Sequence, residues 1–417
     1  MSRFLSQEAA RLAPYTPGEQ PTDAQYLKLN TNESPFPPSP RVIKAVSRAE
    51  LLKLNLYSDP TCSSLCQAIA RRYGLQMENV LAANGSDEVL AFAFRAFCGQ
   101  GKGVAYADIT YGFYAAQTAL FGLDATIIPL REDFTLCVED YMDFPGTIVL
   151  ANPNAPTGMT VPREDIQRLL EANPDRVVIV DEAYVDFGGE SCVPMIFRYD
   201  NLLVVQTMSK SRSLAGGRVG FAMGSPELIA ALNRVKYSFN PYNVNRLSLV
   251  AGTAALEDET YFETCCASIC QSRTWAAGEL KRLGFTVLPS RANFLFVRSP
   301  KNRRRGPLPL PEGKRHSGAV VRFSPYPGLC PHHCGRSGAD AHPDRSGGAA
   351  AGRPVTGGNR YAHGIDSTNH QRNLHFPGTE SGRHRKIRNP HRRGISGPHA
   401  HALRPPRGLR SDRALPG

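Results

Sequence analysis

Three charged side chains stand in segments that could contact a small polar ligand. Lys210 follows an apolar run and lies among the small hydroxyl side chains of Met208-Ser-Lys-Ser-Arg-Ser, and Arg218 comes eight residues later, after a pair of glycines. Asp181 ends a second apolar run, Val177-Val-Ile-Val. A lysine or an aspartate at the end of a strand is often only solvated. A lysine and an arginine that flank hydroxyls and glycines suit a ligand with a phosphate group better.

Two further segments contain residues that are typical of ligand-binding turns. In Ala83-Asn-Gly-Ser-Asp-Glu, Gly85 and Ser86 stand between a predicted strand and a predicted helix. Glycine lets a backbone approach a ligand closely, and a helix N-terminus favours an anion, although many such turns are only helix caps. The segment Asn152-Pro-Asn-Ala-Pro-Thr-Gly predicts a rigid turn after another strand, and by itself it indicates no more than a turn.

The elements that must position these residues alternate between short apolar runs and helical patterns through residues 75–300. That rhythm predicts an α/β fold with a mainly parallel sheet, in which ligands bind at the carboxyl ends of the strands. The predicted strands are Val80–Ala82, Gly103–Ala107, Thr147–Ala151, Val177–Asp181 and Leu202–Gln206, and the predicted helices between them are Ser86–Phe97, Arg163–Leu170 and Pro226–Val235.

A second, smaller domain is predicted to begin near residue 281. Residues 259–300 begin with a long helical pattern. Within the same range, Phe285–Leu288 and Asn293–Val297 are predicted strands. The division we expect is an N-terminal arm over 1–40, a large domain over 41–280, the start of a small domain over 281–300, and a tail over 301–417.

The tail differs in composition from the rest of the chain. Residues 301–417 contain 22 Lys and Arg against 6 Asp and Glu, whereas residues 1–300 contain 27 against 31. All eleven histidines and 32 glycines and prolines also fall within the tail. The tail shows neither a helical stripe nor strand alternation, so its composition predicts a disordered or badly folded segment.

The four segments around Gly85, Asn152, Asp181 and Lys210, in this order, resemble the fold-type I aminotransferases over about residues 10–300. Within that superfamily, Leu29-Asn-Thr-Asn-Glu-Ser-Pro is similar to the histidinol-phosphate branch. The segments that fit the same branch are Pro14-Tyr15, Tyr57-Ser-Asp-Pro60 and Ser290-Arg-Ala-Asn-Phe-Leu-Phe296. The resemblance implies a large domain with a mainly parallel sheet, a small α+β domain that is only begun here, and pyridoxal 5'-phosphate as the cofactor.

The resemblance also implies roles for single residues. Lys210 would form the Schiff base with the cofactor and then move a proton. Asp181 would pair with the pyridinium nitrogen, so that the ring can accept electrons. Tyr184 would hydrogen-bond the phenolic oxygen. Other residues implied to bind the cofactor are Gly85, Ser86, Asp87, Tyr111, Asn154, Thr207, Ser209 and Arg218, with Tyr57 from a second subunit, and those implied to bind substrate are Tyr15 and Asn32.

One position departs from the family pattern. The family usually has an asparagine just before Pro-Thr-Gly, where the side chain bonds the cofactor's phenolic oxygen. Here Ala155 occupies that place, and Asn154 stands one residue earlier. Asn154 is the residue with which the turn could still make this contact.

The tail also lacks the arginine motif with which the family's small domain binds substrate. In a frame shifted by one base, residues 329–336 can encode Tyr-Val-Arg-Ile-Thr-Val-Gly, and residues from Tyr361 and His391 can encode segments similar to imidazoleglycerol-phosphate dehydratase. We therefore expect a frameshift near residue 301. Cys330-Pro-His-His-Cys334 and the arginine-rich Arg383–Arg388 are then products of the shifted frame, so we expect no metal site and no specific nucleic-acid partner.

The expected reaction is amino transfer between histidinol phosphate and 2-oxoglutarate, in a cytoplasmic homodimer that contacts no membrane. The alternatives are an aminotransferase for aromatic amino acids, a threonine-phosphate decarboxylase, an inactive gene product and a basic binding protein. Because the tail lacks the substrate-binding arginine, we expect this polypeptide to have little or no transaminase activity. We also expect the strand near Asn293–Val297 to be left with an unpaired edge.

Overall fold

The computed structural model describes residues 4–6, 9, 12, 29–99, 101, 103–299 and 319–322. Tyr15, Cys330–Cys334 and Arg383–Arg388 lie outside the described residues, so the expectations about them stay predictions. Within the described part of the chain, no helix is both long and apolar enough to span a membrane.

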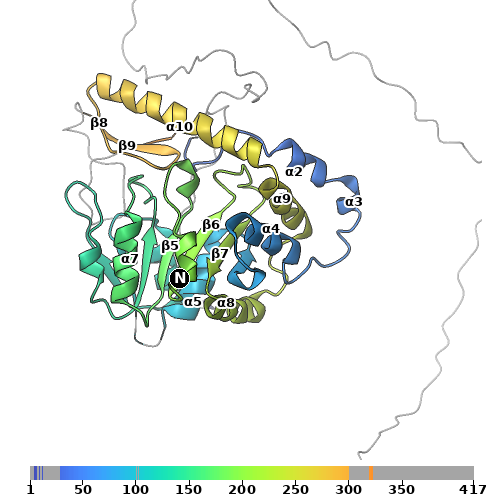
Figure 1. Ribbon diagram of the computed structural model, residues 1–417. Helices are drawn as coiled ribbons and strands as arrows, with labels where there is room; N and C mark the ends of the chain where they lie inside the picture. Colours follow the sequence, from blue (N-terminus) through green and yellow to red (C-terminus); the bar gives the residue numbers. More distant parts are fainter. Residues whose placement is uncertain are drawn as a thin grey trace, which may run out of the picture. The chain divides into compact units, whose positions relative to one another are not determined.

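A seven-stranded sheet forms the centre of the described structure (Figure 1). The strand order is β1-β7-β6-β5-β4-β2-β3, and only β7 runs antiparallel to its neighbours. The mainly parallel sheet predicted from the sequence is confirmed. The strands are β1 (Val80–Ala83), β2 (Val104–Ala107), β3 (Ala125–Ile128), β4 (Thr147–Ala151), β5 (Val178–Asp181), β6 (Leu202–Thr207) and β7 (Gly220–Gly224).

Helices connect and cover these strands. Several begin at a residue that caps them: the Ser225 hydroxyl accepts from the Leu228 amide, and the Asn245 side chain accepts from the Ser248 amide. The helices are α2 (Pro40–Ala45), α3 (Arg48–Leu51), α4 (Ser63–Tyr73), α5 (Ser86–Phe97), α6 (Phe113–Phe121), α7 (Arg163–Ala172), α8 (Pro226–Phe239), α9 (Arg246–Leu256) and α10 (Glu259–Arg282), with short 3-10 turns η1 (Met77–Asn79), η2 (Val138–Tyr141), η3 (Val185–Phe187) and η4 (Val193–Phe197).

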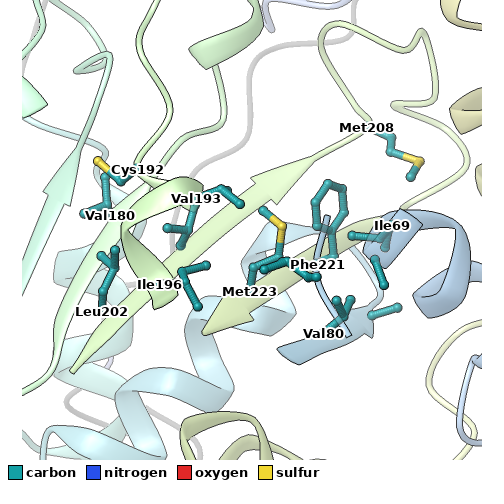
Figure 2. Packing of buried hydrophobic residues seen from close by; sticks show 14 of the residues in the cluster. Ile69, Val80, Val180, Cys192, Val193, Ile196, Leu202, Met208, Phe221 and Met223 are labelled. Carbon is teal, nitrogen blue, oxygen red and sulfur yellow. The ribbon is translucent and has the colours of Figure 1, made fainter. Parts of the chain in front are cut away.

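Two apolar cores lie on the two faces of the sheet. Along β6, Leu202 and Val204 belong to one core, and Leu203 and Val205 belong to the other. This alternation is expected, because successive side chains of a strand point to opposite faces. Figure 2 shows part of the first core, in which Leu202 lies with residues of β7 and of the η4 region. Both faces of the sheet are therefore buried, as the continuous apolar runs predicted.

A second, three-stranded sheet lies next to α10. It consists of β8 (Thr286–Val287), β9 (Phe294–Arg298) and β10 (Ala319–Arg322), in the antiparallel order β10-β9-β8. The buried side chains Ala276, Leu295 and Val297 pack together between α10 and this sheet. The yellow helix and the orange strands in Figure 1 show this unit.

Strand β10 corrects two expectations. We expected no strand beyond residue 301, and this is wrong for residues 319–322. We also expected an unpaired edge at β9, but β9 pairs with β8 on one side and with β10 on the other, in register from Ala319 opposite Val297 to Arg322 opposite Phe294. The apolar run Ala319-Val-Val has only three residues and stands between a glycine and an arginine, so the sequence did not indicate a strand there. In the structure this segment pairs with β9.

Candidate active site

A cavity of about 690 Å³ lies at the carboxyl ends of the parallel strands, where the sequence predicted a ligand site. The turns after β4, β5 and β6 and the first turn of α5 contribute to it. The residues that line it include Thr31, Asn32, Ser86, Asp87, Thr110, Tyr111, Ala155, Asp181, Tyr184, Thr207, Ser209, Lys210, Arg218 and Phe294. Twelve of these fourteen carry a polar or charged side chain, so the cavity suits a polar ligand.

Lys210 reaches this cavity from the turn after β6. Its Nζ donates a hydrogen bond to the backbone carbonyl of Thr31, with an Nζ–O distance of 2.8 Å. The same Nζ lies 5.9 Å from the ring centroid of Tyr184. Lys210, which is the only lysine among the described residues that line the cavity, is therefore held between the N-terminal segment and an aromatic ring.

Asp181 is the last residue of β5 and is only 4 % exposed. Its Oδ2 accepts a hydrogen bond from the Tyr114 hydroxyl at 2.8 Å, and its Oδ1 accepts from the Ala183 amide at 3.2 Å. Burial raises the pKa of Asp181 to about 6, and the negative charge of Asp87 acts in the same direction, whereas the two hydrogen bonds lower that pKa. The carboxyl group thus changes its charge close to neutral pH.

Tyr184 lies across the cavity in the turn after β5. Its hydroxyl accepts a hydrogen bond from Asn32 Nδ2 at 3.0 Å, and its ring packs edge to face against Phe294 at 5.1 Å between centroids. Asn32 has a positive φ of 55°, a conformation that asparagine tolerates better than most residues. Asn293 Nδ2 donates to the carbonyl of Asn32 at 3.0 Å, which fixes the N-terminal segment over the site.

The N-terminus of α5 forms an anion-binding corner of the cavity. Gly85, the residue before the helix, has a φ of 87°, and an added side chain would overlap the Arg218 guanidinium. A side chain at Gly220 would overlap the backbone of Gly85 and Ser86. Free amide groups of a first helical turn and a guanidinium on the same side are what a phosphate group needs.

Asp87 joins two of the predicted cofactor-binding residues. Its Oδ2 pairs with Arg218 Nη2 at 2.9 Å, and its Oδ1 accepts from the Tyr111 hydroxyl at 3.0 Å. The Tyr111 ring stacks on Phe113 at 5.7 Å between centroids. One carboxylate therefore orients both a guanidinium and an aromatic ring at the edge of the cavity.

Thr207 and Ser209 complete the same wall. Thr207 Oγ1 donates to the Val219 carbonyl, at a distance of 3.2 Å, and lies 3.0 Å from Ser209 Oγ. Both residues line the cavity, at the end of β6 and one residue before Lys210. The cavity lining thus includes nine of the residues predicted to bind the cofactor, namely Ser86, Asp87, Tyr111, Asp181, Tyr184, Thr207, Ser209, Lys210 and Arg218.

Asn154 has a different environment from the one we expected. Its Nδ2 donates to the Ile109 carbonyl at 2.9 Å and to Thr157 Oγ1 at 3.0 Å, and its Oδ1 accepts from Thr110 Oγ1 at 2.9 Å. Ala155, and not Asn154, lines the cavity. The Asn154 amide therefore holds the turn together, and its hydrogen-bonding groups are already used.

Tyr57 lies away from the cavity of its own chain. Its side chain is 79 % exposed, and its ring stacks on Tyr242 at 4.5 Å between centroids. Arg246 Nη2 donates to the Tyr57 carbonyl at 3.0 Å. The local backbone thus presents Tyr57 outward in a defined position.

Sequence reasoning missed two groups at the site. Tyr114 contacts Asp181 directly, but in the sequence it is one of several aromatic residues in a helix with no polar signal. The carbonyl of Thr31 contacts Lys210, and a backbone group carries no sequence signal at all. Only the order of the parallel strands, which brings the ends of β2, β4 and β5 together, could have suggested Tyr114.

The residues present fit pyridoxal phosphate. A phosphate group would meet the first turn of α5 and Arg218, a ring nitrogen would meet Asp181, and a carbonyl carbon would meet Lys210. The glycines at positions 85 and 220 let the Arg218 guanidinium and the β7 backbone pack closely against the start of α5, which holds this corner in place.

Comparison with known proteins gives consistent matches. Residues 24–308 match the model of the aminotransferase class I and II family. The chain is 51 % identical over 332 residues to histidinol-phosphate aminotransferase 2 of Dechloromonas aromatica. The matched region covers 78 % of this chain and 92 % of that protein. It is also 51 % identical over 297 residues to histidinol-phosphate aminotransferase of Clostridium acetobutylicum, covering 71 % of this chain and 84 % of that protein.

Solved structures agree with these matches. Histidinol-phosphate aminotransferase of Sinorhizobium meliloti, in complex with pyridoxal-5'-phosphate, has a TM-score of 0.61 at 27 % identity, over 66 % of this chain and 76 % of that chain. Aspartate aminotransferase of Thermus thermophilus has a TM-score of 0.58 at 21 % identity, over 64 % and 76 %, and shows the shared fold alone. The chain therefore belongs to the aminotransferase class I and II family.

Proposed function

We propose that this protein binds pyridoxal phosphate through Lys210 and transfers an amino group between histidinol phosphate and 2-oxoglutarate. The observation that carries the proposal is that Lys210, Asp181 and Arg218 line one cavity at the carboxyl ends of the strands. Each matches one part of the cofactor: its carbonyl, its ring nitrogen and its phosphate.

The cofactor, when bound, supplies a ring that accepts electrons from the substrate. Residues of this chain do the rest. Arg218 and the amides of the first turn of α5 bind the phosphate, and Asp181 holds a proton on the ring nitrogen. Tyr184 and Tyr111 orient the ring from two sides. Lys210 Nζ carries the proton that must move on the substrate, because residues 1–300 contain no histidine that could do so.

The substrate assignment rests on the relatives. Two of them, each half identical to this chain over most of its length, bear the name histidinol-phosphate aminotransferase. Asn32 and Thr31 line the cavity from the N-terminal segment, and Thr31 Oγ1 and Asn32 Oδ1 are buried without a partner among the described residues. We propose that these two groups face the substrate. Tyr15, in the same segment, stays a predicted substrate residue.

An absorbance titration tests cofactor binding. Purified protein is mixed with pyridoxal phosphate, and the band of the lysine-bound cofactor is followed above 400 nm in the wild type and in Lys210→Ala. We expect the band in the wild type and its complete loss in the variant, with Lys236→Ala as a matched control because Lys236 lies outside the cavity. A band that survives Lys210→Ala would exclude this lysine as the anchor.

The substrate is tested by turnover of histidinol phosphate, phenylalanine and threonine phosphate, with the frame-corrected chain measured beside the chain as written. We expect a clear preference for histidinol phosphate in the corrected chain and little turnover in the other. A preference for phenylalanine would indicate an aromatic aminotransferase, and release of carbon dioxide from threonine phosphate would indicate a decarboxylase.

We further propose a cytoplasmic homodimer in which Tyr57 contacts the cofactor phosphate of the partner. Tyr57 is exposed beside a segment whose four leucines, Leu51, Leu52, Leu54 and Leu56, are each about half exposed or more. Exposed apolar side chains in one segment are typical of a protein interface.

Mixing two inactive variants tests this arrangement. Random exchange between Lys210→Ala and Tyr57→Ala versions of the frame-corrected chain should restore one complete site in each hybrid dimer, or about a quarter of the activity of the unmutated frame-corrected chain at equal amounts. A mixture that stays inactive, although size measurements show exchange of subunits, would mean that Tyr57 acts within its own chain.

A further inference from the structure

Tyr114 has a fully buried hydroxyl that bonds a residue of the cavity wall. It lies in α6, its side chain is 0 % exposed, and its hydroxyl donates to Asp181 Oδ2 at 2.8 Å. Burial raises the pKa of Tyr114 well above its usual range, and the charge of Asp181 acts in the same direction. The hydroxyl therefore keeps its proton at any working pH, and it can only donate to Asp181.

The ring of Tyr114 is fixed by other aromatic rings. Phe94 stacks on it at 6.2 Å between centroids, and Tyr106 and Tyr111 pack against it edge to face at 5.9 Å and 5.7 Å. Because these contacts surround the ring, the direction of the hydroxyl is set before any ligand binds. Tyr111 lines the cavity, so the cluster also joins Tyr114 to the cavity wall.

The charge of Asp181 depends on a balance. Burial and the nearby Asp87 carboxylate favour the neutral acid, whereas the donors from Tyr114 and the Ala183 amide favour the carboxylate. Tyr111 and Tyr184 are the other titratable side chains that act on Tyr114 in the same group. Of the two donors, only the Tyr114 hydroxyl belongs to a side chain and can be changed without altering the backbone.

We propose that Tyr114 is a positioning residue, which keeps the Asp181 carboxylate ionised and directs it toward the ring nitrogen of the cofactor. This inference rests on the proposed binding of pyridoxal phosphate. A neutral Asp181 cannot stabilise a protonated ring nitrogen, and a carboxylate that is free to rotate would lose part of its interaction with it. Tyr114 supplies both the charge preference and the orientation.

Tyr114→Phe tests the proposal, with Tyr106→Phe as its matched control. Tyr106 is a buried tyrosine of the same ring cluster, but its hydroxyl lies 3.4 Å from Thr118 Oγ1 and does not bond Asp181. The readout is the dissociation constant for pyridoxal phosphate from pH 5 to pH 8. We expect affinity to weaken roughly ten- to a hundredfold in Tyr114→Phe, with the pH midpoint of binding moved upward, and to change less than about twofold in Tyr106→Phe.

Loss of a purely packing contact would lower stability but would not move the pH midpoint. A double-mutant cycle with Asp181→Asn adds a second criterion, because Tyr114→Phe should have little further effect once the carboxylate is gone. Additive effects in this cycle, or an unchanged pH midpoint in folded Tyr114→Phe, would overturn the proposal.

A second replacement keeps the hydroxyl, so its effect cannot come from a fold that is destabilised by the loss of that group. Site-specific 3-fluorotyrosine at position 114 keeps the shape of tyrosine and makes the hydroxyl a stronger donor, so the pH midpoint should move downward, opposite to Tyr114→Phe. The same replacement at Tyr106 should leave it in place. If the wild type itself binds no pyridoxal phosphate, the proposed function fails, whereas normal wild-type binding with no shift at position 114 refutes only the role of Tyr114.

Discussion

Asp181 and Glu182 are neighbours in the chain and both are buried, but their carboxyl groups point into two different surroundings. The Glu182 carboxylate accepts hydrogen bonds from Ser191 Oγ at 2.7 Å, the Cys192 amide at 2.6 Å and Gln206 Nε2 at 2.8 Å. All of these donors belong to the protein, and none of these residues lines the cavity. We call this group around Glu182 the closed side. Asp181, in contrast, lines the open cavity.

The difference separates polar groups that stabilise the fold from those that serve a ligand. The Glu182 network continues to the Tyr73 hydroxyl, which donates to Gln206 Oε1 at 2.6 Å, so the amide of Gln206 is bonded at both ends. Around the cavity, polar atoms of Thr31 and Asn32 remain without a partner among the described residues. Buried polar groups that the protein does not satisfy are candidates for ligand contacts.

The largest expected effect concerns the cavity side. Asp181→Asn keeps the shape of the side chain but removes the charge opposite the ring nitrogen. We expect pyridoxal phosphate affinity to fall on the order of a hundredfold or more, because a buried charge loses its partner. Glu182→Gln is the matched control, with affinity within about threefold of the wild type. Equal losses in both variants would erase the distinction between the two carboxyl groups.

The second prediction concerns the closed side. Glu182→Ala leaves the Cys192 amide and the Gln206 amide without their acceptor, so the free energy of unfolding should fall by about 3 kcal/mol. Urea denaturation of the cofactor-free protein measures this change. Asp181→Ala should cost less, because the cavity lets water reach the Tyr114 hydroxyl. A larger loss for Asp181→Ala would show that the cavity side stabilises the fold.

The third prediction uses pH. Burial raises the pKa of Glu182 to about 7 and that of Asp181 to about 6. Since both are raised above the values in an unfolded chain, folding favours the protonated forms. Their contribution to stability is complete below about pH 4 and is lost as the pH rises through 6 and 7, on the order of 3 kcal/mol for each group.

Glu182→Gln removes the group with the higher pKa, so the fall in stability of the cofactor-free protein between pH 5 and pH 8 should shrink to about a third. Denaturation at several pH values, compared with the wild type, measures it. Parallel curves for the two proteins would mean that Glu182 does not titrate in this range. Cofactor affinity should move in the opposite sense, because binding needs Asp181 ionised.

The smallest expected effect is that of the distal tail. The described residues that contact the two carboxyl groups all precede residue 300, so a chain ending at Asp344 should bind pyridoxal phosphate within about twofold of the full chain. A chain ending at Ser299 lacks β10 and leaves β9 with an unpaired edge, so it should aggregate more readily. Equal solubility of the two shortened chains would argue that β10 protects nothing.

Sequence patterns predicted the parts of this fold that depend on local chemistry. The helix Ser86–Phe97 has the predicted bounds, and the strands that end at Ala151 and Asp181 lie where continuous apolar runs placed them. Strand β7, Gly220–Gly224, was missed because it has glycines at both ends and only two large apolar residues. Strand β3 was missed because three of its four residues are exposed at the edge of the sheet.

The site shows the same limit. Lys210, Asp181 and Arg218 could be identified because charged residues beside glycines and apolar runs can be recognised in the sequence itself. Tyr114 could not, because its role depends on the distance between α6 and the end of β5. Asn154 was placed in the right turn, but the sequence could not show that Thr110 and Ile109 already occupy its amide.

The packing of Gly85 against the Arg218 guanidinium constrains how this protein can change over evolutionary time. Any residue with a side chain at position 85 would have to displace the guanidinium, and any at position 220 would collide with the backbone before α5. A substitution at position 220 therefore requires the backbone before α5 to move, and one at position 85 requires the Arg218 guanidinium to move. Among relatives, a residue other than glycine at 85 should occur only where the arginine at 218 has also been lost.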